Sequence, residues 1–563
     1  MNNHLCNLAV SNFSVLANPP HRNIEAQNVF SVQAVIDSPK ISFEELSLEV
    51  STQANPPCRS TGIPFKKTPI ELNAALVATN NIFNFLPADH ECFILRDIFE
   101  QLDTSEVEAT FSHKGQNAYH PKLIVAILIY AYSRGVFSSR EIQRLCQQDL
   151  AFMYISQMGC PDFRVLSDFR KDHADFFHQC FKQSVELAAK LGLASLGHVS
   201  LDGSKFKANS SKHKAMSYGR LKEKEQQLTT EIEALLEKAQ RCDQEENLEY
   251  QEKTGYEIPE DLTFKQERLA KIQAAKTALE AREQAINLDK AIDDKKQISF
   301  ADTDARIMGK NGHFDYCYNG QICVDADAQI IVAQHISLNA NDKQEVLPAL
   351  KELKETTGRL PEKMTTDNGY MSGDNLAAFE ETDIDAYIAT DKGEKSPKDD
   401  LKDSERHLTK ADFTYNETDD TFTCPNEQVL SVISTGKDGS KVYQGSAEAC
   451  AECPLYKRCC QSKKGEARTI STDDKEPLRQ EMNAKMELPE SKIIYAQRKV
   501  IVEPVFGQIK NTGFRGFSVR GKEKVAGEFS LVCTAHNIKK IFRAISKGLV
   551  CPEFGNLATN PAI

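Results

Sequence analysis

Apolar residues recur at helical spacing through the first strongly patterned segment of the chain, residues 83–193. Within it an apolar run begins at Pro121, and Ser138 and Asp149 can each cap a short helix that begins just after them. Residues 161–192 then form one long amphipathic stretch. The pattern predicts short helices joined by tight turns, followed by a long helix.

Basic side chains are expected to face outward on these helices. They are Arg134, Arg140, Arg144, Arg164, Arg170 and Lys171. Short helices with exposed basic residues are typical of a helix-turn-helix DNA-binding module. A generic helical bundle fits the same pattern, so both interpretations stay open at this stage.

The pattern changes to short apolar strands in the middle of the chain. Strands are expected over 198–206, 315–324, 329–337, 362–366 and 386–389, with a helix over 342–356 and another between the last two strands. The second and third strands read as an antiparallel hairpin. This order of strands and helices predicts an α/β fold with a mixed sheet.

Residues 216–292 interrupt this α/β region. Leu228 and Leu235 belong to a helical repeat set among Glu, Lys, Gln and Arg, and Gly255 and Pro259 break the run. We therefore expect a helical hairpin inserted between two core strands as an accessory element.

The charge distribution changes the first impression given by composition. The formal net charge is −12, which by itself counts against nucleic acid as a partner. However, residues 111–215 carry fourteen Lys and Arg against eight Asp and Glu, and residues 492–547 carry twelve against three. Segregated charge of this kind is the footprint of a phosphate-backbone binder, although a basic block can also be a solvated face.

The longest apolar run and the cysteine content indicate the cellular compartment in which the protein is expected. The run Leu123–Tyr132 has ten residues, too few to cross a bilayer, and the N-terminus lacks the basic segment of a secretory signal. Sixteen cysteines without an export signal indicate reduced thiols or metal ligands rather than a disulfide framework. We therefore expect a cytoplasmic protein with no membrane partner.

Three acidic residues stand apart from the charge runs. Asp202 lies in an otherwise apolar strand, and Asp367 follows the end of another strand. Glu503 lies among basic residues, where a salt bridge is the simplest explanation for a lone glutamate. If residues 495–510 form one unbroken helix, Glu503 shares a broad face of that helix with four other side chains. Those four are Tyr495, Arg498, Phe506 and Lys510. Pro504 disfavours helical geometry at Glu503, so the helix can also be kinked or begin again there.

Converging carboxylates have a specific chemical use. They are hard oxygen ligands suited to Mg²⁺ or Mn²⁺. Two such ions can stabilise both the attacking and the leaving oxygen of a phosphoryl displacement. Flanking Arg and Lys side chains would then hold DNA phosphates in position.

Several motifs taken together resemble a known family. They are residues 201–204 (Leu-Asp-Gly-Ser), 302–306 (Asp-Thr-Asp-Ala-Arg), 318–321 (Tyr-Asn-Gly-Gln), 366–370 (Thr-Asp-Asn-Gly-Tyr), Tyr495, Arg498, 502–507 (Val-Glu-Pro-Val-Phe-Gly), Lys510 and 536–537 (His-Asn). The sequence resembles bacterial insertion-sequence transposases of the DDE type, and among them insertion-sequence group 1182, in the superfamily with a Tyr-Arg-Glu-Lys signature. The resemblance covers roughly residues 81–542.

Together with the hydrophobic pattern, the resemblance predicts an α/β fold with an RNase H-like mixed-sheet catalytic core. Residues 1–80 would be a disordered or loosely ordered arm, and 549–563 a tail. The expected domains are a helical DNA-binding domain (81–195), the catalytic core (196–215, 301–411 and 491–548), the inserted helical hairpin (216–300) and a cysteine-rich insertion (412–490).

The resemblance also implies roles for individual residues. Asp202, Asp367 and Glu503 would hold two Mg²⁺ or Mn²⁺ ions. The expected DNA-binding residues are Tyr495, Arg498, Lys499, Lys510, Arg515 and Arg520. Four residues separate Arg498 from Glu503 where the signature has three, so Lys499 is a rival to Arg498.

Five cysteines cluster between the second and third acidic residues. They are Cys424, Cys450, Cys453, Cys459 and Cys460. The spacing of Cys450 and Cys453 is that of a zinc knuckle, and the others could complete a structural Zn²⁺ site. Unrelated cytosolic thiols are the alternative.

The leading hypothesis is a DNA transposase that binds the terminal inverted repeats of a bacterial insertion sequence, cuts the DNA and joins the 3′-hydroxyl ends to double-stranded target DNA. It would act as at least a homodimer on DNA, in the cytoplasm with the nucleoid. An RNase H-like nuclease or resolvase without strand transfer, and a domesticated non-catalytic DNA-binding protein, are the alternatives. A helical scaffold built on the inserted hairpin is a more distant one.

Overall fold

A computed structural model describes most of the chain. The described residues are 65–66, 82–111, 118–210, 215–249, 260–286, 291–310, 312–390, 407–436, 439–460 and 466–550. The expected arm lies outside this set except for its part in β1 (Phe65–Lys66), which pairs in parallel with β2 (Ala118–Tyr119). The expected tail lies outside it beyond residue 550. No helix among the described residues is long and apolar enough to cross a membrane.

The region after the arm is helical, as the pattern predicts. Its elements are η2 (Ile82–Phe85), α5 (Glu91–Glu100), α6 (Ser105–Glu108), α7 (Pro121–Ser133), α8 (Ser139–Gln148), α9 (Leu150–Ile155), α10 (Phe163–Asp172) and α11 (Ala174–Lys190). Asp149 caps α9 by accepting hydrogen bonds from the backbone N–H groups of Ala151 and Phe152. The single long helix expected over 161–192 is wrong: His173 leaves helical geometry, its ring packs on Phe169, and the stretch divides into α10 and α11.

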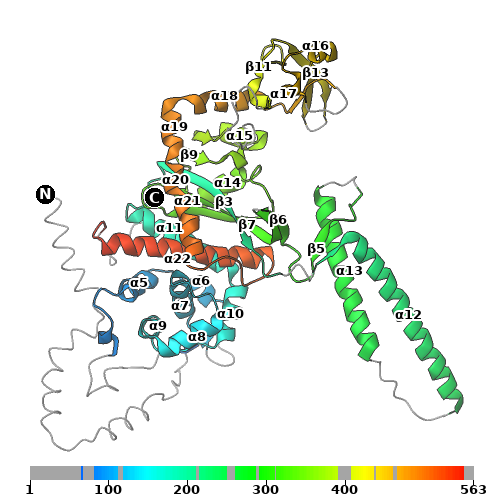
Figure 1. Ribbon diagram of the computed structural model, residues 1–563. Helices are drawn as coiled ribbons and strands as arrows, with labels where there is room; N and C mark the ends of the chain where they lie inside the picture. The colour runs from blue at the N-terminus through cyan, green and yellow to red at the C-terminus, as the bar shows by residue number, and fades with distance from the viewer. Residues whose placement is uncertain are drawn as a thin grey trace, which may run out of the picture.

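A long C-terminal helix, α22 (Lys522–Ser546), holds these helices against the rest of the protein. It packs on α7, α10 and α11 and on strand β8 (Ile331–Ser337), and it runs between the helical region and the central sheet (Figure 1). Its fully buried Glu528 accepts a hydrogen bond from the Tyr132 hydroxyl at 2.6 Å and one from the backbone N–H of Ser518.

Arg170 takes part in the same buried network, so its expected outward orientation is wrong. Its guanidinium donates to the hydroxyl of Tyr132 at 2.9 Å and to the carbonyl of Phe137 at 3.0 Å, and it lies 4.0 Å from Glu528. A buried cation needs such partners because water no longer solvates it. Arg170 therefore ties the helical region to α22.

The central sheet is mixed, as predicted. Its strands are β3 (His198–Lys207), β6 (Arg306–Lys310), β7 (His313–Asp325), β8, β9 (Lys363–Thr366) and β10 (Asp385–Ile388). β9 lies parallel to both β3 and β10. β7 runs antiparallel to β3 along one edge, and along the other it pairs with β6 and then β8.

Helices flank this sheet and lead away from it. They are α14 (Val346–Thr357), α15 (Gly373–Glu380), α18 (Glu476–Glu487), α19 (Pro489–Ala496), α20 (Arg498–Ile501) and α21 (Glu503–Asn511). The unbroken helix considered over 495–510 is wrong, because three helices cover this range. Gln497 ends α19, and α21 begins at Glu503 with Pro504 in its first turn, where a missing N–H costs little.

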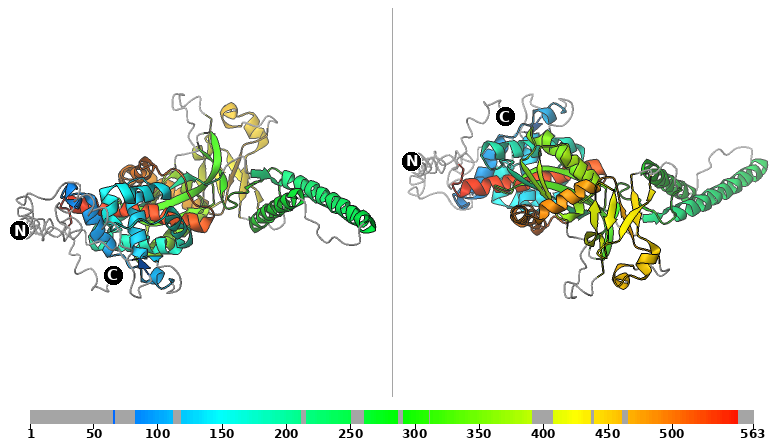
Figure 2. Two further views of the ribbon diagram at one scale, coloured as in Figure 1. Left: turned by 90° about the horizontal axis from the view of Figure 1, so that it is seen from below. Right: turned by 90° about the horizontal axis from the view of Figure 1, so that it is seen from above.

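Two long helices form the predicted hairpin between core strands. α12 (Tyr218–Glu249) and α13 (Glu260–Ile286) pack together through Leu221, Leu228, Ile272 and Leu279. The short antiparallel strands β4 (Ala215–Ser217) and β5 (Gln297–Ser299) close its base. The hairpin projects far from the sheet in every view (Figures 1 and 2).

The cysteine-rich insertion contains a sheet that its sequence pattern did not predict. Strands β11 (Thr414–Asn416), β12 (Thr421–Thr423), β13 (Val429–Thr435), β14 (Lys441–Gln444) and β15 (Thr469–Thr472) form an antiparallel meander, accompanied by η5 (Lys410–Asp412), α16 (Ala447–Ala451) and α17 (Tyr456–Cys459). Phe422 and Tyr443 form its small core with Leu430 and Ile470.

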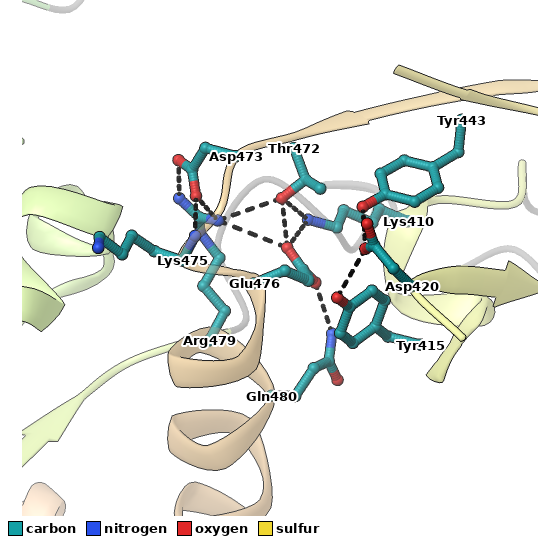
Figure 3. A network of polar contacts seen from close by, with 10 residues as sticks. All are labelled: Lys410, Tyr415, Asp420, Tyr443, Thr472, Asp473, Lys475, Glu476, Arg479 and Gln480. Carbon is teal, nitrogen blue, oxygen red and sulfur yellow. Dashed lines mark hydrogen bonds and ion pairs between the residues drawn. The ribbon is translucent and has the colours of Figure 1, made fainter. Parts of the chain in front are cut away.

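A polar network fixes this insertion to the start of α18 (Figure 3). Glu476, 1% exposed, accepts a hydrogen bond from Lys410 Nζ at 2.5 Å and lies 3.4 Å from Arg479. Arg479 also forms a two-point ion pair with Asp473. Because every charge in it has a partner, the network holds the small sheet in one position relative to α18.

Candidate active site

Two parallel strands bring the predicted aspartates side by side. Leu201 of β3 is paired with Thr366 of β9, so Asp202 and Asp367 are the next residues along neighbouring strands. Asp202 lies within β3, whereas Asp367 follows the last residue of β9 and caps the 3₁₀ helix η4 (Asn368–Tyr370). Its Oδ1 accepts a hydrogen bond from the backbone N–H of Gly369 at 2.7 Å.

All three predicted carboxylates meet at one guanidinium group. Arg498 Nη2 lies 2.9 Å from Asp202 Oδ2 and 3.9 Å from Asp367 Oδ2, and Nη1 donates to Glu503 Oε1 at 3.0 Å. The Arg498 side chain is 8% exposed and that of Asp202 17%, while Glu503 remains 48% exposed. The break between α20 and α21 therefore does not separate Glu503 from the aspartates.

Burial and charge act against each other at Asp202. The pKa of Asp202 is raised to about 6, chiefly by burial and also by the negative charges of Asp367 and Asp342, although Arg498 acts to lower it. A carboxylate this poorly solvated needs a nearby positive charge to stay ionised at neutral pH. Arg498 supplies that charge in the structure.

Asp342, which sequence reasoning missed, is a fourth carboxylate beside the pair. It precedes α14, and its Oδ1 accepts hydrogen bonds from Gln321 Nε2 at 2.6 Å and from Asn319 Nδ2 at 2.8 Å. The Tyr370 hydroxyl donates to Gln321 Oε1, which fixes the orientation of that amide. Burial raises the pKa of Asp342, and the charge of Asp367 also raises it.

Two glycines allow this close approach. A Cβ atom at Gly203 would lie 2.3 Å from Gln321 Nε2 and 2.9 Å from Asp342 Oδ1. A Cβ atom at Gly369 would lie 2.8 Å from Asp367 Oδ1 and 3.4 Å from Asp342 Oδ2. Glycine is therefore needed at both positions to let the carboxylates and the amide pack together.

A signal for Asp342 was present in the sequence. Asn319 and Gln321 are polar residues in a strand that is otherwise apolar at its centre, and they are 2% and 0% exposed. Buried amides require hydrogen-bond partners, so these two residues predict a polar or charged side chain packed against this strand. The sequence pattern alone did not reveal which partner they would have.

Tyr495 and Lys510 lie close to the carboxylate cluster. The pKa of Tyr495 is raised by burial and by the charges of Asp367, Glu503 and Asp202, and lowered by Arg498. Lys510 Nζ donates to the Ser204 hydroxyl, two residues after Asp202 on β3. Its ammonium group also lies 5.5 Å and 5.6 Å from the ring centres of Phe206 and Phe506.

The remaining predicted DNA-binding residues lie outside the cluster. Lys499 is exposed and does not share the position of Arg498 among the carboxylates. Arg515 and Arg520 line an open hollow of about 520 Å³ with Lys207, near the base of the helical hairpin. Arg520 is held there by donating from Nε to the carbonyl of Asn209 at 2.9 Å.

The residue types at the cluster fit a divalent cation. Three carboxylates from three separate elements converge on one cationic group, which is the donor set that Mg²⁺ or Mn²⁺ takes. In the part of the chain that the structure describes, no three His, Cys, Asp or Glu side chains are grouped to hold one metal ion, the cysteine cluster included. At the carboxylates, the guanidinium of Arg498 lies among the acids.

The structure brings part of the cysteine cluster together. The Cys460 thiol is within hydrogen-bonding reach of the Cys450 and Cys459 thiols. Burial, together with the neighbouring thiol of Cys460, raises the pKa of Cys459 to about 12. Cys424 Sγ instead accepts a hydrogen bond from the backbone N–H of Gln428, and Cys453 follows α16. All five are free thiols.

Two protein-family models match parts of this chain. The family described as Transposase DDE domain matches residues 423–542, and the family described as Transposase domain (DUF772) matches residues 80–172. The comparison with curated proteins gave no match, and neither did the comparison with solved structures.

The matched spans correspond to two parts of the structure. One covers most of the cysteine-rich sheet, α18 to α21 and most of α22, including Arg498, Glu503 and Lys510. The other covers the helical region from η2 to α10. Asp202 and Asp367 lie outside both spans. The two matches show that these two parts of the chain are similar to transposase domains.

Proposed function

We propose that this DDE-type transposase cuts the ends of a bacterial insertion sequence with two divalent metal ions and joins the liberated 3′-hydroxyl ends to target DNA. Asp202, Asp367 and Glu503 are the proposed catalytic residues. Insertion-sequence group 1182 is the proposed group within the family, and an RNase H-like core the proposed fold. The sheet supports that fold, because β9 runs parallel to both β3 and β10 while β7 runs antiparallel to its neighbours β3 and β8.

The convergence of three carboxylates on the Arg498 guanidinium carries this proposal. Residues from β3, from the end of β9 and from the first turn of α21 would have little reason to meet at one cationic centre in a purely structural protein. Structural ion pairs usually involve two partners, and a third acid adds repulsion. The arrangement is the one expected where acids gather to hold metal ions beside a phosphate.

The protein's own residues supply positioning and charge. Bound Mg²⁺ or Mn²⁺ would supply Lewis acidity toward the phosphate and the attacking oxygen. Asp202 and Asp367 are fixed by adjacent strands, and Glu503 by the start of a helix, so their spacing is set by the fold. Arg498 neutralises the acids when DNA is absent and presents the two-pronged N–H edge that matches a phosphate.

Lys510 extends the site along β3. Its ammonium is held by Ser204 and two aromatic rings, which orients a cation beside the carboxylates at little entropic cost. Tyr495 would lie beside the reacting strand. Exposed Lys499, together with Arg515 and Arg520 in the hollow, would hold backbone phosphates further away.

Two further parts of the proposal concern assembly. Joining two element ends requires at least two active sites, so we propose a homodimer on DNA. We also propose a structural Zn²⁺ site in the cysteine-rich insertion, on the knuckle spacing of Cys450 and Cys453. The described thiols are not grouped to hold an ion, so the ligands would close around Zn²⁺ as it binds.

A strand-transfer assay tests the function against its nuclease alternative. A labelled duplex carrying the sequence that flanks the gene would be incubated with the protein, Mg²⁺ and a supercoiled target plasmid. We expect labelled plasmid that retains the element's 3′ end, and none with Asp367→Asn. Cleavage without labelled plasmid would favour a nuclease, and cleavage by Asp367→Asn at the wild-type rate would overturn the catalytic assignment.

A further inference from the structure

A basic cavity lies between the helical region and the C-terminal helices, apart from the carboxylate cluster. Its volume is about 420 Å³. It is formed by the end of α7 and the residues after it, by α21 and by α22. Its charged and polar lining includes Arg134, Gln508, Asn511, His536, Lys539, Lys540 and Arg543.

The cavity is lined by a different side of α21 from the one that carries Glu503. On a helix with about 100° per residue, Gln508 and Thr512 lie on the side of α21 opposite to Glu503. Gln508 Nε2 donates to the side chain of Gln329, which follows β7, so this face of α21 packs against the edge of the sheet near α22. The cavity is therefore a separate site, joined to the active site through one helix.

Positive charge is concentrated in this cavity. Lys539, Lys540 and Arg543 lie within two turns of α22, and Arg134 approaches from the end of α7. Burial, together with the charges of Arg543 and Lys547, lowers the pKa of Lys540 to about 8. Burial and Arg543 also lower the pKa of Lys539, on which Glu91 acts in the opposite direction.

The polar contacts hold the cationic groups in place but do not neutralise most of them. Lys539 Nζ donates to the carbonyl of Ser133 at 3.1 Å, and Lys540 Nζ donates to Gln329 Oε1 at 2.5 Å. These acceptors carry no charge. Arg134 is the exception, because it forms an ion pair with Glu91 at 2.8 Å. A site that gathers cations around a cavity while leaving them unneutralised is built for an anion.

We infer that this cavity binds a phosphate group of the DNA backbone, on the face of α21 opposite to Glu503. The inference rests on the proposed function. Arg543 is exposed, and its guanidinium group can form two hydrogen bonds to one phosphate, while the partly buried Lys540 supplies a point charge. Because the cavity contacts both α7 and α21, a phosphate there would align DNA held by the helical region with the catalytic helix.

The test compares charge-removing and charge-keeping variants in DNA binding. Lys540→Gln/Arg543→Gln removes two cations of the cavity, and Lys540→Arg/Arg543→Lys keeps both. Lys351→Gln, at a 76% exposed position on α14, removes the same kind of charge elsewhere. Affinity for a short fluorescent DNA duplex would be measured over a range of salt concentrations without metal, so that no cleavage occurs.

We expect the Gln pair to bind DNA about tenfold more weakly and to lower the slope of log affinity against log salt by about one. The Arg/Lys pair and Lys351→Gln should behave like the wild type. Thermal melting checks that all variants fold. Wild-type affinity and slope in the folded Gln pair would overturn the inference.

A second arm uses inorganic phosphate, because a free anion has the same chemistry. Isothermal titration with phosphate, on wild type and on the Gln pair, reports whether the cavity binds the isolated ion. Binding of phosphate that the Gln pair loses, together with unchanged DNA binding, would identify a free-anion site and contradict the assignment to the backbone. Failure of the wild type to bind any DNA would instead count against the proposed function itself.

Discussion

The Arg498 guanidinium lies 2.9 Å from Asp202 Oδ2, and both side chains are nearly buried. Asp367 and Glu503 share the same guanidinium at 3.9 Å and 3.0 Å. One cation therefore offsets the repulsion among three acids. Arg498 is a stabilising element when the carboxylates hold nothing else, and it competes for them with any metal ion.

Replacing Arg498 by alanine should destabilise the metal-free protein. Asp202 would lose its main positive partner while remaining buried, and removing one member of a buried pair costs about 3 kcal/mol. Urea unfolding at pH 7.5 measures the change. Arg498→Lys keeps the positive charge, so its free energy of unfolding should fall less than that of Arg498→Ala.

Adding Mg²⁺ shows whether Arg498→Ala is destabilised by repulsion among the acids or only by the loss of packing around the side chain. If the acids form a cation site, Mg²⁺ should restore much of the stability lost in Arg498→Ala, and should stabilise the wild type less. Equal effects of Mg²⁺ on the two proteins would contradict the account.

Asp342 should matter for the site although it lies outside the predicted triad. Asp342→Asn places an amide group against the Nε2 of Gln321 and the Nδ2 of Asn319, which both donate, and it removes a charge beside Asp367. We expect DNA cleavage to fall about 10- to 100-fold, as for other supporting residues of metal sites. Glu355→Gln, an exposed acid on α14, is the matched control and should cleave normally.

The glycines near the cluster give a second, steric test. Gly203→Ala would force Gln321 and Asp342 apart, because its Cβ would lie 2.3 Å from Gln321 Nε2. We expect loss of cleavage and a stability cost of about 1–3 kcal/mol. Gly507 lies on α21, and a Cβ atom added there would have no atom within 4 Å. Gly507→Ala should therefore keep the fold and raise the free energy of unfolding by up to about 1 kcal/mol. Equal melting temperatures for both variants would argue against close packing at Gly203.

What the sequence revealed was mainly local. Asp202 and Asp367 could be identified because each interrupts or ends a short apolar strand, and strands of this kind pair side by side. Arg170 was placed outward because its buried partner, Glu528, lies on α22, which the local pattern cannot bring near. Asp342 was missed for the same reason: its partners come from β7, whose pairing with β3 is a long-range contact.

The helix around Glu503 shows a different limit. The side chains were assigned to one face on the assumption of a single helix. The helix is instead interrupted at Gln497 and Val502, and Arg498 and Glu503 are still in contact. The correct residues were grouped by an incorrect geometry. Short breaks of this kind depend on tertiary contacts that outweigh helix propensity.

The cavity beside α22 predicts a pH dependence of DNA binding. The pKa of Lys540 is lowered to about 8 by burial and by Arg543 and Lys547, and its nitrogen faces Gln329. His536, which packs nearby, is held neutral by burial, with a pKa lowered to about 3. Lys540 is therefore charged below about pH 8 and loses its proton above it, so DNA affinity should fall between pH 7 and pH 9. In Lys540→Arg the fall should be smaller, and an identical fall would exclude Lys540 as its cause.

The most direct test of the central claim is single-turnover cleavage of an element-end duplex in Mg²⁺ by the three carboxylate variants, Asp202→Asn, Asp367→Asn and Glu503→Gln. Glu490→Gln, an exposed acid in the first turn of α19, is the control. If the three acids act together, each variant should lose at least about 10³-fold in rate, and the control should cleave like the wild type. Wild-type cleavage by any one of the three folded variants would contradict the account.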